Sequence, residues 1–296
     1  MRAPMSHRWA VATMVGSTLL WSIAGIVTLQ LERAKSFEVT FWRSAFTALA
    51  LLALLAWLRG PERLKRAFAE GGRTLWISGL CWSVMFTAFM LALTLTSVAN
   101  VLVTESIAPL LTALVARIAL GHRIAARTGV AILVAGVGIA WMYAREVVGA
   151  DPRHLLGSLV ALAVPTAAAV NWTAIQSTRS SPQRDLLPAV LIGAVVSSLV
   201  TLPLALPFAG SAHDIAWLAL LGVAQLAVPC LMSVAAARAL AAPEVALLGL
   251  LEILFGVAWP WIAGRETPAS HVLAGGALVL AALVVNEALA LRRRLA

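Results

Sequence analysis

Long apolar stretches, each about as long as a membrane-spanning helix, fill almost the whole chain. A spanning helix needs about 20 mostly apolar residues, and these stretches lack the period-two alternation of β-barrel strands. Backbone amides in lipid must be paired within their own segment, so the stretches are expected to be helices. The pattern predicts ten spans, at 8–29, 38–58, 75–95, 98–119, 127–143, 155–176, 187–209, 214–236, 243–263 and 271–291.

Composition agrees with an all-α polytopic membrane protein. Only 12% of the residues are charged and 61% are hydrophobic, whereas a soluble domain carries about 25% charged residues. Ten spans with short connections use up the 296 residues and leave no room for a soluble domain. Cys81 and Cys230 both lie in apolar stretches, so the sequence predicts no disulfide framework, no metal site and no cofactor.

The net charge of +9 is better explained by membrane topology than by nucleic-acid binding. The basic residues lie in short loops, and no basic helix with interleaved aromatic residues is present. Fifteen Lys and Arg residues fall in the termini and inner loops, against five in the outer loops, namely Arg33, Lys35, Arg145, Arg153 and Arg265. The positive-inside rule therefore predicts cytoplasmic termini in a bacterial-type cytoplasmic (inner) membrane. The first stretch exceeds the 7–15 residues of a signal-peptide core, so it is expected to be an uncleaved span.

Two halves of the chain, 1–144 and 150–296, follow a similar order of features. In each half an acid-containing span ends on a glycine before a charged residue, and a span rich in small residues follows. Five spans per half would insert the second half with the opposite orientation. Such inverted repeats are typical of secondary transporters, whose substrate site lies where the repeats meet. Chance similarity between two Ala-, Leu- and Val-rich segments is the alternative.

Four segments resemble the EamA-type family of the drug/metabolite transporter superfamily. They are "LLWSIAGIVTLQL", "FEVTFWRSAFTALALLALL" with Arg43, "FMLALTLTSVANVLVTESIAPLLTALVARIALGHR" with Pro109, and "LLEILFGVAWPWIAGRE". The resemblance extends over nearly the whole chain as two five-helix units. It implies a ten-helix secondary carrier that exports small metabolites, and it says little about which metabolite.

Arg43, Glu105 and Glu252 are ionisable residues within predicted spans, where each charge costs about 2.5–3.5 kcal/mol on insertion scales. Arg43 and Glu105 lie at similar depths below the outer surface, so an ion pair between them is expected; direct contact with substrate or a proton is the alternative. Glu252 lies near the midplane with no basic residue in its own helix. Removal from water favours its protonated form, so it is the candidate for proton coupling or for binding a cationic group. A protonated Glu252 bonded between helices is the structural alternative.

Uncharged polar and aromatic residues within the spans have two possible roles, one in the substrate site and one in helix packing. Asn100, Asn171 and Gln225 either line a cavity or bridge helices, since interhelical hydrogen bonds average only about 0.6 kcal/mol. Trp21 and Trp82 either present their rings to a ligand or pack in the core. All five are therefore candidates for the substrate site.

Proline and small residues within the spans suggest where helices bend or approach closely. Pro109, Pro165, Pro229 and Pro260 each remove a backbone hydrogen bond and are hinge candidates, although static kinks would look the same. The small residues of "GVAILVAGVG" and "AGGALVLAAL" permit close helix packing, either within the chain or in a homodimer.

The function predicted from these features is secondary active export of small organic metabolites by alternating access, with proton coupling through Glu252. A facilitative uniporter or exchanger, or an uptake permease for amino acids or related metabolites, is the alternative. A membrane-embedded enzyme is disfavoured because the chain has no H-E-x-x-H or G-x-S-x-G motif and its histidines lie at termini or in loops. The expected partners are the small-molecule substrate and the lipid bilayer.

Overall fold

The computed structural model describes residues 5–28, 30–34, 36–96, 101, 104–121, 125–143, 152–178, 185–263 and 270–295. All regular secondary structure in these ranges is helical, which confirms the predicted all-α class. The helices are α1 (His7–Trp21), α2 (Ala24–Thr28), α3 (Ser36–Arg59), α4 (Pro61–Glu70), α5 (Gly72–Leu95), α7 (Ala108–Leu120), α8 (Ala126–Tyr143), α9 (Pro152–Ser177), α10 (Leu187–Ala205), α11 (Ala212–Leu220), the π-helix η1 (Leu221–Ala227), α12 (Val228–Ala237), α13 (Ala242–Gly249), α14 (Leu251–Ile262) and α15 (Ser270–Leu295).

Within the described residues, six helical segments are long and apolar enough to cross a membrane. They are His7–Thr28, Phe37–Arg59, Gly72–Ala92, Leu156–Ser177, Leu187–Ala205 and Ala212–Ala237. Three shorter apolar helices, Ala108–Leu120, Ala126–Trp141 and Ser270–Asn286, occupy predicted spans. The count of ten spans and the inverted repeat therefore stay predictions.

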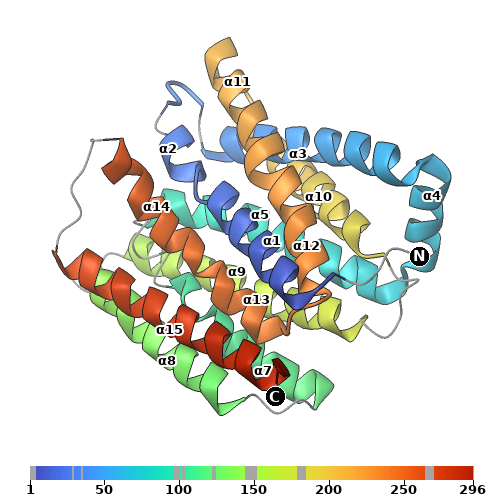
Figure 1. Ribbon diagram of the computed structural model, residues 1–296. Helices are drawn as coiled ribbons and strands as arrows, with labels where there is room; N and C mark the ends of the chain where they lie inside the picture. The colour runs from blue at the N-terminus through green and yellow to red at the C-terminus, as the bar shows by residue number, and fades with distance from the viewer. Residues whose placement is uncertain are drawn as a thin grey trace.

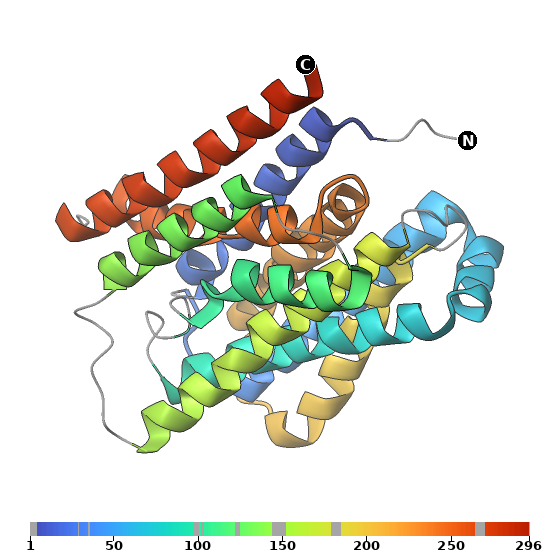
Figure 2. The ribbon, with the colours of Figure 1, turned by 90° about the horizontal axis from the view of Figure 1, so that it is seen from below.

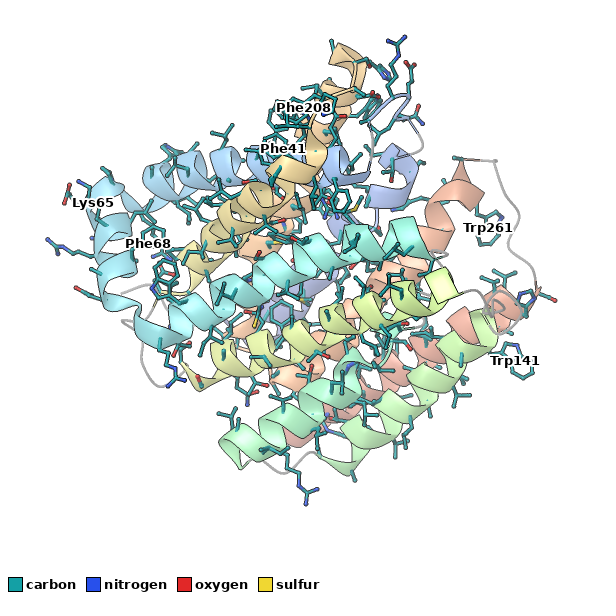
Figure 3. All side chains as sticks on the ribbon, turned by 180° about the vertical axis from the view of Figure 1, so that it is seen from behind. Phe41, Lys65, Phe68, Trp141, Phe208 and Trp261 are labelled. Carbon is teal, nitrogen blue, oxygen red and sulfur yellow. The ribbon has the colours of Figure 1, made fainter. Side chains whose placement is uncertain are left out.

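Apolar side chains also cover much of the outer surface, as expected of helices that face lipid. Trp57 is 82% exposed, Ile118 76% and Ile262 75%. Trp141 and Trp261 project from the bundle on the side opposite Lys65 (Figure 3). Both tryptophans lie at predicted outer span ends, where an aromatic belt is expected.

Helices from distant parts of the sequence form the interior of the bundle. Helix α5 packs against α9 and α10, and α10 also packs against α3. Helices α8 and α15 run side by side at one edge, as two views show (Figures 1 and 2). At that edge, a Cβ added to Gly138 would lie 2.8 Å from the Gly275 carbonyl oxygen. The two small-residue stretches are thus used within the chain, to let α8 and α15 approach closely.

Two buried acids that were not predicted site residues stabilise loops at one end of the bundle by accepting backbone N–H groups. Asp214 in the first turn of α11 accepts the backbone N–H groups of Glu32 (2.8 Å), Arg33 (3.1 Å), Ala34 (3.2 Å) and Ser211 (3.1 Å). Glu38 in α3 accepts the backbone N–H groups of Ala209 and Gly210, each at 2.9 Å. Because their oxygens are used in this way, both acids have a structural role.

Candidate functional site

Three helix interruptions converge on one region inside the bundle. Helix α1 ends at Trp21 and α2 begins two residues after its C-cap, Ser22. A turn at 106–107 separates Glu105 from α7, and α13 gives way to α14 at Leu250. Interrupted helices free backbone groups and can place polar side chains at membrane depth, as they do in many secondary transporters.

A cavity of about 160 Å³ lies at these interruptions. Seven of the residues predicted to be functional are in its wall: Trp21, Arg43, Trp82, Glu105, Pro165, Gln225 and Glu252. The two predicted halves both contribute to it, since the first four come from residues 1–144 and the last three from residues 150–296. The structure thus gathers side chains that lie far apart in the sequence around a single space.

The ionisable side chains in the cavity are arranged differently from the predicted Arg43–Glu105 ion pair. No nitrogen–oxygen contact within 4.0 Å joins these two described residues, so that expectation was wrong. Glu252 instead lies within electrostatic range of both Arg43 and Glu105. Similar depth along two helices says nothing about which way each helix is turned, and this is why the pairing could not be predicted.

Arg43 is held in the cavity wall by a single backbone contact. Its side chain is 3% exposed, and Nη2 donates a hydrogen bond to the Phe86 carbonyl oxygen at 3.2 Å. Its Nε is buried and has no hydrogen-bond partner. A buried donor without a partner is costly, so Arg43 is poised to donate to a bound group.

Aromatic rings form one wall of the cavity. Trp82 and Trp172 meet edge to face, with ring centroids 5.6 Å apart and an interplanar angle of 89°. Phe86 also packs against Trp82, at a centroid distance of 5.5 Å. Trp82 is 3% exposed, and its Nε1 donor is buried without a partner. This wall offers apolar contact together with one free N–H group.

Gln225 links the interrupted first helix to the cavity. It lies in the π-helical segment η1, a geometry that often occurs at functional sites. Its Nε2 donates to the carbonyl oxygen of Trp21 at 3.1 Å, which satisfies a backbone acceptor left free where α1 ends. Its Oε1 is buried and unpartnered, so an acceptor remains for a ligand.

Of the two asparagines predicted as site candidates, the structure describes Asn171, which bridges two helices and does not line the cavity. Asn171 bridges α9 and α5, because its Oδ1 accepts a hydrogen bond from the Ser78 hydroxyl at 2.6 Å. Asn171 is absent from the cavity wall, so the bridging alternative applies. Asn100 lies outside the described residues.

The four prolines occupy three kinds of position. Pro165 lies inside α9 and lines the cavity, and Pro260 lies within α14. Pro109 and Pro229 instead stand in the first turns of α7 and α12. In the first turn of α7 the missing N–H of Pro109 would have no intrahelical partner. Pro229 instead follows η1 within the continuous helical segment Ala212–Ala237, where a proline does remove a helix hydrogen bond. A hinge role for any of the four stays a prediction.

Several cavity residues gave no signal in the sequence. Met14, Met85, Phe86, Phe89 and Trp172 all line the space, yet each reads as one more apolar residue in a spanning stretch. Only the register of each helix distinguishes a cavity-facing residue from one that faces lipid. That register is a property of the folded bundle.

Comparisons with known proteins agree with this architecture. Residues 8–144 match the model of the EamA-like transporter family. A solved structure described only as a crystal structure of a protein superposes with a TM-score of 0.79 at 18% identity, over 97% of this chain and 98% of that chain. At this identity the likeness shows a shared fold alone. A search of curated proteins gave no match. Residues 8–144 thus match the EamA-like transporter family of the drug/metabolite transporter superfamily, and the chain as a whole shares its fold with a solved structure.

Proposed function

We propose that the protein is a secondary carrier that exports a small organic molecule bearing an amino group, and that the cavity is its substrate site. The match of residues 8–144 to a transporter family supports membrane transport as the general activity. The observation that carries the proposal is the convergence of three helix interruptions on a cavity walled by both halves of the chain. Substrate sites of secondary transporters are built in this way, from discontinuous helices where two halves meet.

The chemistry of the cavity favours an amphipathic substrate. Trp82, Phe86 and Trp172 would hold an apolar body by contact with their rings. Glu105 and Glu252 would receive an ammonium group, and the free Nε of Arg43 would receive a carboxylate. Apolar amino acids, such as L-phenylalanine and L-leucine, combine these three groups, and phenethylamine lacks only the carboxylate.

Counterflow in proteoliposomes tests the proposal. Vesicles are loaded with a high concentration of unlabelled L-phenylalanine or L-leucine and diluted into a trace of the labelled compound. A carrier produces a transient excess of label inside the vesicles, whereas a channel only lets the label equilibrate. We expect the excess in the wild type and its loss in Glu105→Gln, which removes the charge of an acid in the cavity wall. Glu62→Gln, at a site 75% exposed on α4, is the matched control. Equilibration without excess for all three compounds, phenethylamine included, would contradict the proposal.

Glu252 is the residue we propose for proton coupling. It stands in the first turn of α14, directly after the interruption at Leu250, and lies within electrostatic range of both Arg43 and Glu105. Protonation of Glu252 would therefore change the balance of charge around a bound substrate. Counterflow and gradient-driven transport are measured from pH 5 to 9 in wild type and in Glu252→Gln. Loss of the pH dependence in the variant is expected; an unchanged pH profile would assign the proton step elsewhere.

The family resemblance supports export as the direction of transport. Cells that express the protein are preloaded with labelled L-phenylalanine, and its release is followed against cells that express Glu252→Gln. We expect faster release with the wild type. Faster uptake from the medium, with no change in release, would favour an uptake permease.

A further inference from the structure

A second cavity, of about 240 Å³, lies apart from the first, where α4 meets the ends of three other helices. The first turns of α10, the end of α3 and the C-cap of α12 complete its wall. Four arginines line it, Arg59, Arg63, Arg66 and Arg238, together with the acids Glu70 and Asp185. None of these residues lines the substrate cavity.

The amphipathic helix α4 gives this cavity its charge. Arg63, Arg66 and Glu70 follow one another at helical spacings of three and four, and so share one face of α4. Leu64 is buried on the bundle side, whereas Lys65 is exposed and pairs with Glu62 at 3.2 Å. Figure 3 shows the same division, with Lys65 pointing away from the bundle and Phe68 pointing toward it.

Positive charge exceeds negative charge in the cavity. Asp185 is already engaged, because its Oδ2 lies 3.3 Å from Nη2 of Arg59 and its Oδ1 accepts the backbone N–H of Leu187. Arg63, Arg66 and Arg238 make no hydrogen bond or ion pair through their side chains with any residue in the described part of the chain. Among the described residues that line the cavity, four guanidinium groups and two carboxylates leave a net charge of +2 for an anionic group to neutralise.

The surroundings of the cavity are those of a membrane interface. Trp57 and Leu58, which precede Arg59 in α3, are 82% and 55% exposed, and Trp76 near the start of α5 is 52% exposed. Tryptophan favours the headgroup level of a bilayer, and exposed apolar side chains beside it favour acyl chains. A group bound by the arginines would therefore extend an apolar part along α3 and α5.

We propose that this cavity binds the phosphate headgroup of an anionic membrane lipid. Arginine suits phosphate because its planar guanidinium donates two parallel hydrogen bonds. Basic cavities between helices at the membrane surface bind anionic headgroups, and each basic side chain contributes about 1 kcal/mol there, which is about fivefold in affinity. Arg63 and Arg66 together should account for about 25-fold. This inference does not depend on the substrate or the direction of transport.

Native mass spectrometry of the full-length protein in detergent tests the proposal. Phosphatidylglycerol and phosphatidylcholine of the same acyl chains are titrated separately, and the dissociation constant of the first bound lipid is measured. The wild type should prefer phosphatidylglycerol, and Arg63→Gln/Arg66→Gln should weaken that binding about 25-fold while leaving phosphatidylcholine binding unchanged. Lys65→Gln, on the outer face of the same helix, is the matched control and should keep the preference.

Three results would overturn the proposal. One is equal binding of the two lipids by the wild type, and another is full phosphatidylglycerol binding by the double variant. The third is displacement of phosphatidylglycerol by millimolar inorganic phosphate, together with a rise in Tm with phosphate alone that equals the rise with the lipid. This result would show that the ligand is a free anion. Circular dichroism of the double variant shows whether it is folded. If it is not, Arg66→Lys is measured instead: it keeps the charge, loses the paired donors and is expected to weaken binding severalfold, and unchanged binding would contradict the proposal.

Discussion

Gly222 in the π-helical segment η1 allows the backbone of α3 to approach closely at Arg43. A Cβ added to Gly222 would lie 2.6 Å from the Phe46 Cβ, 2.7 Å from the Arg43 carbonyl oxygen and 2.9 Å from the Thr47 backbone nitrogen. The Thr47 hydroxyl also donates to the Gly222 carbonyl oxygen at 2.9 Å. Gly222→Ala therefore forces η1 away from the part of α3 that holds Arg43.

The size of the effect follows from these distances. Ordinary contact begins at 3.4 Å, so the gap between η1 and α3 must open by about 0.8 Å, and most of the obstructing atoms are backbone. Overpacking of this kind costs about 1–3 kcal/mol. Because Arg43 and Gln225 move apart, we expect counterflow to be lost even where the protein remains folded.

The assay compares Gly222→Ala with Gly136→Ala, a helical glycine with nothing within 4 Å of an added Cβ. Thermal unfolding in detergent gives Tm, and counterflow gives activity. Gly222→Ala should lower Tm by about 2–4 °C for each kcal/mol of lost unfolding free energy, and it should abolish counterflow. Gly136→Ala should leave both Tm and counterflow unchanged. Wild-type Tm and counterflow in Gly222→Ala would refute the reasoning.

Three further predictions distinguish polar groups that stabilise the fold from polar groups that bind the substrate. Asp214→Asn leaves at least one of the four bound backbone N–H groups without its acceptor, so Tm should fall by an amount equivalent to about 1–3 kcal/mol of stability. The control is Glu32→Gln at an exposed side chain, and equal Tm values for the two variants would contradict the structural role of Asp214. Ser78→Ala removes the 2.6 Å bond to Asn171 and should cost about 0.6 kcal/mol without affecting counterflow, and a large loss of transport would place Asn171 in the mechanism. Trp82→Phe keeps an aromatic ring and removes the free Nε1 donor, so it should weaken substrate affinity and leave Tm within a degree; unchanged half-saturation in counterflow would show that the donor is not used.

The sequence predicts those features of the fold that depend on local composition. The apolar stretches predict helices, and residues such as Arg43, Glu105 and Glu252 stand out because lipid makes charges costly. Seven of the predicted residues indeed meet at one cavity. Which acid acts electrostatically on Arg43 could not be predicted, because this depends on how α3 and α14 are turned about their axes.

Other features become visible only in the folded chain. Trp172 is indistinguishable in sequence from tryptophans that face lipid, yet it packs edge to face on Trp82. Asp214 and Glu38 read as span-end acids, and only the approach of distant loops shows that they bind backbone N–H groups. Arg63 and Arg66 read as topology signals, and the helix α4 turns them toward one cavity.

Chemical modification of Cys230 is the most direct test of the claim that the cavity is the substrate site. Cys230 lines the cavity and is fully buried, and Cys81 is the other cysteine of the chain. In a Cys81→Ser protein, N-ethylmaleimide should modify Cys230 slowly, excess L-phenylalanine should slow it further, and the modified protein should show no counterflow. A Cys230→Ser protein that keeps Cys81 should remain active under the same treatment. Full modification of Cys230 with wild-type counterflow would contradict the account.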